Sequence, residues 1–411
     1  MIVKKQVPEV RFKVFNKEWN HLTLGENAKF TKGQGYSKGD LVTSGAPIIL
    51  YGRLYTKYQT VITSVDTFVT EKDKSVKSMG GEVIVPASGE SPEDISRASV
   101  VSEPNVILGG DLNIVLPSKK IDSTFLALAL SNGRLKKELS SKAQGKSVVH
   151  IRNSDLAVLD LILPTEYIEQ TTIGTYFQKL DTLINQHQQK HDKISSIKKA
   201  MLEKMFPKKG ETIPEIRFKG FSGDWLNNPL REICGATFGG GTPSTSVKSF
   251  WEGDIPWIQS SDLKDGHVSS VTAIKNITKA AVTKSATKLV SANSIAIVTR
   301  VGVGKLSLMK GEYATSQDFL SLSDLKVDAQ YSAYAIWKQL QIEKEQVQGT
   351  SIKGITKEEL LSKTISYPKN ESEQSKIGTY LQMLDSLIDQ HQQQMTKLNN
   401  IKQACLSKMF V

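Results

Sequence analysis

The sequence is poor in cysteine and in long apolar stretches. Cys234 and Cys405 are its only cysteines, and they imply neither a metal cluster nor a disulfide framework, which favours a cytoplasmic protein. The longest aliphatic run, residues 125–130, is far shorter than the ~20 residues that span a bilayer. Residues 1–8 are basic but lack the apolar core of a secretory signal. We therefore expect a globular cytoplasmic protein.

Catalytic signatures are also missing. Gly145-Lys146-Ser147 ends like a phosphate-binding loop, but Ser140 stands where that loop needs its first glycine. The run Phe238-Gly-Gly-Gly241 lacks the acidic residue of a dinucleotide site, and we interpret it as a loop that approaches another backbone segment. No Pro-Pro dipeptide occurs, so the Asn/Asp-Pro-Pro-aromatic motif of adenine methyltransferases is absent. The six histidines form no evident triad, so we predict a binding protein without a catalytic, metal or cofactor site.

The charge balance points to an acidic partner. Lysine and arginine number 53 against 42 aspartates and glutamates, which gives a net charge of +11 over 411 residues. Such a balance favours nucleic acid as the partner, although on charge alone a merely basic protein is an equal alternative. The length is enough for two or three domains, each with its own core.

An internal repeat dominates the chain. Residues 173–207 recur as 377–411, at a constant offset of 204, with 21 of 35 positions identical. A second block, residues 8–19, recurs as 214–225 with 7 of 12 positions identical.

The segments between these blocks diverge. Each holds about 140 residues, and only their tails align, with residues 145–151 over 349–355. Two similar frames therefore hold two inserts whose middles look unrelated. Duplication alone does not require the inserts to diverge more than the repeated blocks. Two surfaces that recognise different targets would require the inserts to diverge more.

Each long repeat predicts a helix. Pro164 and Pro368 precede the two blocks, and Asn370 with Glu373 forms a start that resembles a capping box. Apolar residues follow at steps of three and four, which is typical of a coiled-coil seam. The predicted helix-pair interface consists of Ile173, Phe177, Leu180, Ile184, His187, Ile194, Met201, Ile377, Leu381, Leu384, Ile388, His391, Met395 and Leu398.

Chain connectivity predicts how the helices pair. The second insert begins where the first helix ends and leads into the second helix, so helices that pair within one chain must be antiparallel. About 40 residues at 1.5 Å each predict a rod of roughly 60 Å with a head at each end and a pseudo-two-fold axis. An intermolecular coiled coil is the alternative. His187 and His191 have the spacing of metal ligands, but Met395 matches the second histidine and indicates packing instead.

The charge lies mainly outside these helices. Residues 165–207 and 369–411 each carry a net charge of +1, which leaves +9 for the rest of the chain. Basic heads on a rigid spacer suit the reading of two separated stretches of duplex, where phosphate contacts supply affinity and base contacts supply sequence.

With these features the sequence resembles the specificity (S) subunits of type I restriction-modification enzymes. The resemblance covers essentially the whole chain and includes the helix motif Leu-Asp-x-Leu-Ile-x-x-His with the ending Lys-Met-Phe. The insert motifs that carry it are Gly45–Gly52 with Tyr55 and Tyr58, Gly81–Gly89, Gly240–Thr245 and Phe250–Trp257.

The resemblance implies an α/β fold class: mixed α+β recognition domains joined by two long antiparallel coiled-coil helices. Target recognition domain 1 would span residues 1–164, with an N-terminal arm at 1–20, and the first spacer helix 165–207. Domain 2 would span 208–368, and the second spacer helix 369–411.

The resemblance also implies partners. Each recognition domain would read one half of a bipartite site in double-stranded DNA, and the helices would set the spacing and dock two methyltransferase (M) subunits. Those would bind S-adenosylmethionine and methylate adenine N6, while restriction (R) subunits would use ATP and Mg for translocation and cleavage. This chain would itself be non-catalytic. A self-contained methyltransferase or nuclease, and a structural coiled-coil scaffold, are the competing hypotheses.

Candidate DNA contacts are chosen mainly by side-chain chemistry. Glutamine and arginine read base edges, lysine neutralises phosphate, and tyrosine can do either or stack on a base. In the first domain the candidates are Gln34, Tyr36, Lys38, Arg53, Tyr55, Ser88, Lys146 and His150. In the second they are Thr242, Ser244, Lys248, Ser260, Arg300, Lys305, Gln317 and Lys353. Trp251 and Trp257 are expected in the core.

Overall fold

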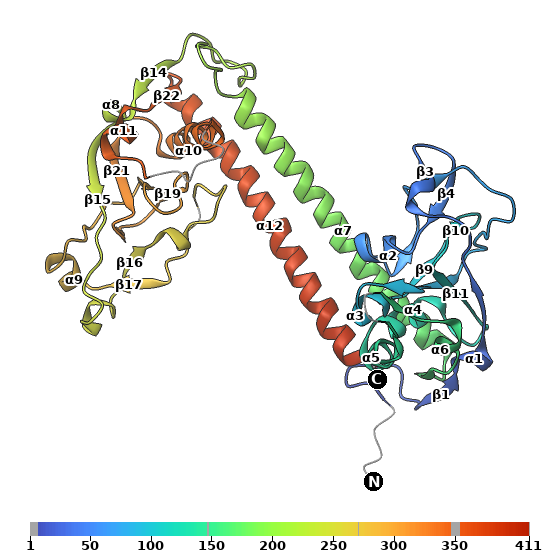
Figure 1. The fold of residues 1–411 in the computed structure, drawn as a ribbon. Helices are drawn as coiled ribbons and strands as arrows, with labels where there is room; N and C mark the ends of the chain where they lie inside the picture. The colour runs from blue at the N-terminus through green and yellow to red at the C-terminus, as the bar shows by residue number, and fades with distance from the viewer. Residues whose placement is uncertain (1–6, 146–147, 270, 347–353, 411) are drawn as a thin grey trace. The chain divides into compact units, whose positions relative to one another are not determined.

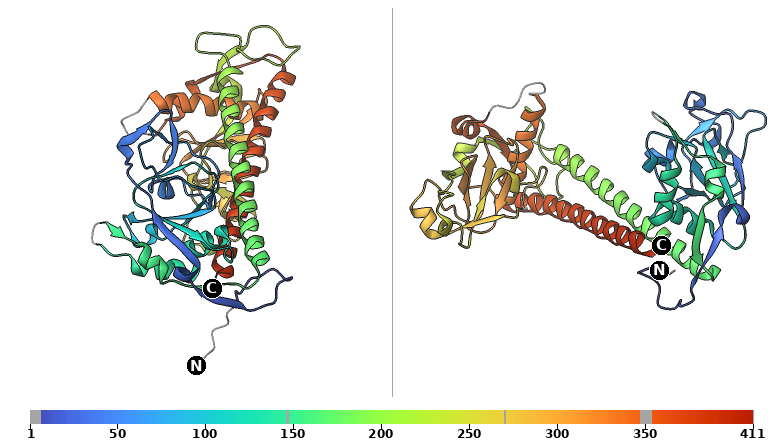
Figure 2. Two further views of the ribbon diagram at one scale, coloured as in Figure 1. Left: turned by 90° about the vertical axis from the view of Figure 1, so that its right-hand side faces the viewer. Right: turned by 60° about the horizontal axis from the view of Figure 1, so that its bottom comes forward.

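The computed structural model describes residues 7–145, 148–269, 271–346 and 354–410. The chain divides into two units, the first formed by Met1–His187 with Gln393–Val411 and the second by Gln188–Gln392. Each unit therefore combines one insert with parts of both long helices, α7 (Tyr167–Lys204) and α12 (Glu371–Met409). Figures 1 and 2 show the elements of each unit from three directions.

The strands of the first unit form one larger sheet and three smaller ones. The larger sheet has the order β2-β11-β7-β9-β5, and a four-stranded sheet has the order β10-β4-β6-β3. Antiparallel pairs β1-β13 and β12-β8 complete the unit. The strands are β1 (Trp19–Thr23), β2 (Ala28–Lys32), β3 (Leu41–Val42), β4 (Ala46–Ile49), β5 (Val61–Ile62), β6 (Phe68–Val69), β7 (Glu82–Pro86), β8 (Ser88–Gly89), β9 (Ser99–Val101), β10 (Ile107–Leu108), β11 (Leu112–Pro117), β12 (Val149–His150) and β13 (Asp160–Pro164).

Helices cover the larger sheet of the first unit. The apolar helix α4 packs on β7 and β9, and both belong to the same buried cluster as the start of α7. Asp122 caps α4 by accepting a hydrogen bond from the Phe125 N–H at 2.8 Å. The helices are α1 (Leu24–Asn27), η1 (Lys38–Asp40), α2 (Arg53–Thr56), α3 (Pro92–Ile95), α4 (Ser123–Ser131), α5 (Gly133–Lys142) and α6 (Asn153–Ala157).

The second unit has a similar plan. Its larger sheet has the order β15-β21-β18-β19, a smaller one has the order β17-β16-β20, and β14 pairs with β22. Helix α10 packs on β18, β19 and β22. The elements are β14 (Leu226–Pro229), α8 (Leu230–Ile233), β15 (Cys234–Gly239), η2 (Lys248–Phe250), β16 (Ile255–Ile258), η3 (Ser260–Asp262), β17 (Lys275–Ile277), α9 (Lys279–Thr283), β18 (Ser294–Val298), β19 (Leu306–Met309), β20 (Ala314–Thr315), β21 (Phe319–Leu325), α10 (Ala329–Gln346), α11 (Lys357–Ser362) and β22 (Thr364–Tyr367).

The two inserts share a topology that their sequences do not reveal. The strand order β2-β11-β7-β9 of the first unit is repeated by β15-β21-β18-β19 in the second, with all neighbours antiparallel. The parallel pair β4-β10 is matched by β16-β20, and β1-β13 by β14-β22. The middles of the inserts, which look unrelated in sequence, are therefore variants of one fold.

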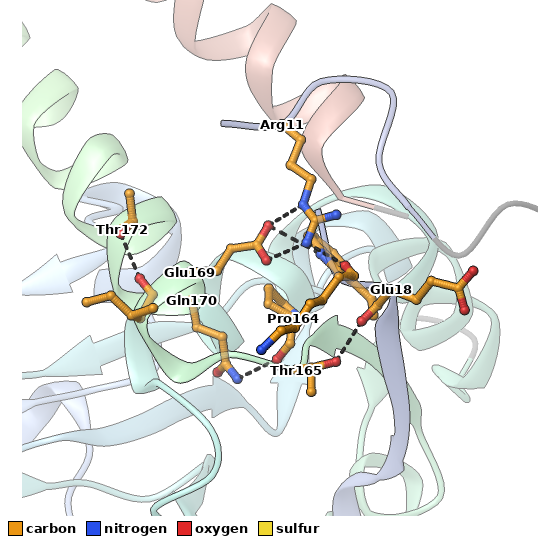
Figure 3. A network of polar contacts seen from close by, with 10 residues as sticks. Arg11, Glu18, Pro164, Thr165, Glu169, Gln170 and Thr172 are labelled. Atoms are coloured by element: carbon orange, nitrogen blue, oxygen red, sulfur yellow. Dashed lines mark hydrogen bonds and ion pairs between the residues drawn. The ribbon is translucent and has the colours of Figure 1, made fainter. Parts of the chain in front are cut away.

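Each N-terminal block is tied to the helix that follows its insert. The Arg11 guanidinium donates to the Glu169 carboxylate through Nε at 2.6 Å and Nη2 at 2.7 Å (Figure 3). Arg217 makes the same bidentate pair with Glu373, at 2.7 and 2.8 Å. Asn370 accepts the Glu373 N–H at 3.3 Å and so caps α12, as predicted, but the Glu373 side chain bonds Arg217 instead of closing a capping box.

A glutamine one residue later repeats the same arrangement. Gln170 donates to the Pro164 carbonyl at 3.1 Å (Figure 3) and accepts the backbone N–H of the residue that caps α4, at 2.9 Å. Gln374 donates to the Pro368 carbonyl at 2.7 Å and accepts the N–H of the residue before α10, at 2.8 Å. The two repeats therefore hold their inserts by the same bonds.

Within each unit the two long helices run antiparallel. Near the start of α7, Asp181 pairs with Lys402 near the end of α12 at 2.5 Å, and both belong to the first unit. In the second unit Lys198, near the end of α7, pairs with Asp385, near the start of α12. The partners lie in one chain, as the connectivity argument predicts.

The predicted interface residues lie at different depths. The first part of each series is fully buried in a core that also contains residues of the insert and the end of the other helix. In the first unit these are Ile173, Phe177 and Leu180 with Leu406, Met409 and Phe410, and in the second Ile377, Leu381 and Leu384 with Leu202, Met205 and Phe206. Met395 is buried, and the half-buried positions are Ile184, His187, Ile194, Met201, Ile388, His391 and Leu398.

Candidate nucleic-acid interface

Two candidates of the first unit, Gln34 and Ser88, lie at one edge of its larger sheet. Strands β2 and β7 both pair antiparallel with β11, so they run in the same direction and end at the same edge. Gly33 and Gln34 follow β2, and Ser88 follows β7. The Gly33 N–H donates to Leu112 O at 2.9 Å, and the Gln34 N–H to Leu108 O at 3.1 Å, which holds this loop against the start of β11 and the end of β10.

The second unit builds the same edge. Strands β15 and β18 flank β21 and end together, with Gly240 after β15 and Arg300 after β18. Gln317 lies just before β21. The Gly241 N–H donates to Thr315 O at 2.8 Å, which is the counterpart of the Gln34 bond in the first unit.

A glycine is required at this edge in both units. A Cβ on Gly33 would lie 1.9 Å from Gly109 O, and a Cβ on Gly240 would lie 1.8 Å from Ser316 O. Any side chain there would push the two backbone segments apart. The prediction that the run 238–241 approaches another backbone segment is therefore confirmed.

The aligned tails of the inserts return to the same edge. In the first unit β12 pairs with β8, and the His150 Nδ1 shares a hydrogen bond of 3.0 Å with Ser88 Oγ. In the second the Ile355 N–H donates to Thr299 O at 2.7 Å, and Gly354 lies against Arg300. Each tail thus adds polar groups to the edge formed by the strand ends. Lys146 and Lys353 fall outside the described residues.

Several candidates of the first unit have partners inside the protein. Tyr36 is 6% exposed, and its hydroxyl accepts the Lys72 N–H at 2.7 Å. Arg53 pairs with Asp66 at 2.6 Å. The Tyr55 hydroxyl donates to Ser88 O at 2.5 Å, and burial raises the pKa of Tyr55. These side chains connect the small sheet to its neighbouring loops. A ligand could contact their polar groups only if those groups bonded the ligand in addition to their partners within the protein.

The exposed candidates are the ones free to meet a ligand. Gln34, Lys38, His150, Thr242, Ser244, Lys248, Arg300 and Gln317 are exposed, whereas Ser260 and Lys305 are half-buried and Ser88 is buried. Lys305 Nζ donates to Leu263 O at 3.1 Å, and Thr242 Oγ1 donates to Gln317 Oε1 at 2.6 Å. Trp257 is buried as expected, with its indole N–H on Gly241 O at 3.0 Å, and Trp251 packs edge-on against it.

Two cations at this edge are not among the residues predicted from the sequence. Lys357 is exposed and lines a cavity of about 590 Å³ together with Gly240, Arg300 and Gln317. Arg152 is exposed and directly follows the aligned tail of the first insert. Both lie within two residues of the aligned tails 145–151 and 349–355, and this proximity is the sequence signal that marks them.

The edge offers binding chemistry. Guanidinium, ammonium, amide and hydroxyl groups are donors that suit phosphate oxygens and the acceptors of base edges. Among the described residues no group of three or more histidine, cysteine, aspartate or glutamate side chains is placed to hold a metal ion. Within the same residues no helix is long and apolar enough to cross a membrane.

Comparisons with known proteins identify the same duplicated plan. The sequence model described as "Type I restriction modification DNA specificity domain" matches residues 16–196 and again 222–400. The chain is 30% identical over 197 residues to the Type I restriction enzyme MjaIX specificity subunit of Methanocaldococcus jannaschii, an alignment that covers 46% of this chain and 44% of that protein. It is 44% identical over 89 residues to the Type I restriction enzyme EcoR124I/EcoR124II specificity subunit of Escherichia coli, which is 21% of each chain.

These alignments span less than half the length of either curated relative. One solved structure, a type I restriction-modification system S subunit from M. genitalium, is similar over 98% of this chain and 99% of its own, with a TM-score of 0.63. Its sequence identity is 15%, so this likeness shows the fold alone. Because the family model matches well over half of the sequence, in two copies, the chain belongs to the family of type I restriction modification DNA specificity domains.

Proposed function

We propose that this chain is the DNA-recognition subunit of a type I restriction-modification complex, in which each unit reads one half of a bipartite target. The observation that carries the proposal is the second copy of the specificity domain. The two copies have the same strand order and an equivalent sheet edge each, but different side chains at that edge. A single continuous target would not need two such surfaces.

In this proposal the chain is divided as the repeats suggest. Residues 1–164 and 208–368 serve as target recognition domains, and residues 165–207 and 369–411 as spacer helices. The exposed candidates of each sheet edge contact base edges, and the flanking lysines contact phosphates, so that affinity falls with rising salt while sequence preference does not.

The partners follow from the duplication. Matching ion pairs and glutamine bonds hold each insert on its helix in the same way, and this internal equivalence supports near-equivalent docking of two copies of one methyltransferase subunit. S-adenosylmethionine, ATP and Mg then belong to the methyltransferase and restriction subunits, and this chain is non-catalytic. The assembly acts on DNA in the cytoplasm.

Mapping of methylated sites tests the function. Deleting the gene should remove one bipartite motif from the genome's methylation pattern, and restoring it should bring the motif back. Replacing residues 21–160 by the same segment of a relative should change one half of the motif and leave the other half intact. If deletion removes no motif, or if the replacement changes both halves, the proposal fails.

The helices provide a second readout. Lengthening both by the same number of turns should change the number of unread base pairs between the half-sites and leave the bases of both half-sites unchanged. A change in the recognised bases would contradict the spacer role.

A further inference from the structure

Arg300 differs from most arginines of this protein. Carboxylates pair with Arg11, Arg53, Arg97, Arg134 and Arg217. Among the described residues none pairs with Arg300, which is exposed at the end of β18. Its guanidinium is therefore available to a ligand, with five N–H donors in a planar fork.

The backbone that carries this guanidinium is held firmly. Thr299, the preceding residue, donates to Asp318 O through its N–H at 2.7 Å and through its hydroxyl at 3.1 Å. Its own carbonyl accepts the Ile355 N–H at 2.7 Å. Arg300 thus directly follows a residue whose backbone is bonded to two other segments, so little backbone ordering is needed when its guanidinium binds a ligand.

A second donor lies beside it. Arg300 and Gln317 line the same cavity of about 590 Å³, together with Gly240 and Gly354. Thr242 Oγ1 donates to Gln317 Oε1 at 2.6 Å, which orients the carboxamide and leaves its NH₂ group as a donor. Because glycines are among the lining residues, a ligand can approach the backbone closely.

The edge of the first unit carries different chemistry at the corresponding place. Ala87 O accepts the Ile151 N–H as Thr299 O accepts that of Ile355, so Ser88 stands where Arg300 does. Ser88 is buried and bonded to His150, and the exposed Glu90 follows two residues later. The two units therefore present opposite charges after the equivalent strand.

We infer that Arg300, assisted by Gln317, reads a guanine in the half-site bound by the second unit. Guanine presents two acceptors, O6 and N7, in the major groove, and a guanidinium fork donates to both at once. Adenine and thymine offer one acceptor beside a donor or a methyl group, so they fit two neighbouring donors less well. This inference rests on the proposed DNA-recognition function and adds a base preference that belongs to one half-site only.

The test uses the full chain co-expressed with its methyltransferase subunit. The motif is first mapped with the wild-type chain, and Arg300→Ala and Arg300→Lys are then compared with Arg231→Ala. Arg231 is an exposed arginine of α8, at the start of β15 and thus the opposite end of the sheet. Binding is measured by competition between the mapped duplex and duplexes that carry a single changed G·C pair.

The expected result is a loss of discrimination at one G·C pair of the second half-site, by about 10- to 100-fold in Arg300→Ala. Arg300→Lys keeps the charge and can still donate to O6 and N7, but not through a planar fork, so it should lose part of the same discrimination even if the alanine variant is destabilised. The first half-site and the Arg231→Ala variant should keep the wild-type preference.

Three results would overturn the inference: a second half-site without a G·C pair, unchanged discrimination in both Arg300 variants, or an equal loss of affinity for all duplexes with a smaller salt dependence. The last result would assign Arg300 to a phosphate. Each is distinct from failure of the proposed function, in which deleting the gene removes no methylated motif at all.

Discussion

Each unit contains an equivalent ion pair between its two helix segments, but the surroundings of the two pairs differ. In the first, Asp181 and Lys402 border a cavity of about 510 Å³ whose wall also includes Thr60 and Gln178. In the second, the matching Lys198 and Asp385 are about 90% buried, beneath Tyr334 and Trp337 of α10. The repeats encode one such pair in each unit, and the insert of that unit determines how exposed the pair is to solvent.

Burial changes what the pair does. Lys198 also donates to Gly266 O at 2.9 Å, and the Tyr334 hydroxyl donates to Asp385 at 2.5 Å. Burial, and then the neighbouring Asp385, raise the pKa of Tyr334, so the hydroxyl keeps its proton and remains a donor. A buried ion pair whose groups are all hydrogen-bonded favours one packing arrangement of the core. Removing only one of its two partners is costly, because the other charge stays buried without its partner.

Removing one carboxylate from each pair tests this difference. Asp385→Ala should lower the free energy of unfolding by about 3–5 kcal/mol, because it leaves the buried Lys198 ammonium without its carboxylate. Asp181→Ala should cost about 1 kcal/mol or less, since its pair lies next to solvent. Chemical denaturation, monitored by hydrogen exchange of peptides from each unit, would measure the loss in free energy of unfolding for both variants.

The double variant Lys198→Met with Asp385→Leu is the control. It removes both buried charges and should recover most of the loss caused by Asp385→Ala. Equal costs for Asp181→Ala and Asp385→Ala would contradict the claim that the inserts set the value of the pair.

The glycine at the sheet edge should behave alike in both units. Gly33→Ala and Gly240→Ala would place a Cβ 1.9 and 1.8 Å from a carbonyl oxygen, so each should lose about 1–3 kcal/mol of stability through overpacking. Gly239→Ala is the matched control, because nothing lies within 4 Å of its Cβ and its effect should stay within about 0.5 kcal/mol. Thermal unfolding of the three variants decides whether the two edges are equivalent, and a harmless Gly240→Ala would show that they are not.

The smallest expected effect is a pH dependence of the small sheet in the first unit. A hydrogen bond from Lys72 and others from Ser37 lower the pKa of Asp40 to about 2, and hydrogen bonds from Lys57 and Arg53 lower the pKa of Asp66 to about 2. A pKa lowered by folding adds stability that is present above the ordinary value of 3.8 and is lost as the pH falls through about 2.

Both carboxylates are solvent-accessible, so the loss should be local. Hydrogen exchange of residues 41–69 should accelerate as the pH falls from 4 towards 2, after correction for the intrinsic exchange rate. Lys72→Met should return the Asp40 titration, followed by NMR, towards its ordinary range and leave that of Asp66 in place. If the pKa of Asp40 stays lowered in this variant, the hydrogen bond from Lys72 is not the cause of the lowered pKa.

The frame could be predicted because its signals are local. The periodic apolar positions, the prolines and the Asn370 cap lie within a few turns of one another, and they predicted helices close to α7 and α12. The role of Glu373 was missed, because its partner Arg217 lies 156 residues away and no local rule relates them.

The shared fold of the inserts could not be predicted in this way. Many of their strands hold two to five residues, and buried strands such as β7 and β18 lack the alternation that marks a half-exposed strand. Their pairing is long-range: β1 meets β13 and β14 meets β22 across the whole insert. Such contacts depend on the collapsed chain and leave little trace in the sequence.

The sequence by itself determined the duplication, the two long helices and the family, because repeats and helical periods are written along the chain. Only the tertiary structure decided which polar candidates are free. Tyr36, Arg53 and Tyr55 find partners 36, 13 and 33 residues away, whereas Arg300 finds none among the described residues. Side-chain chemistry is the same in both cases, but availability depends on what folding brings within hydrogen-bonding distance.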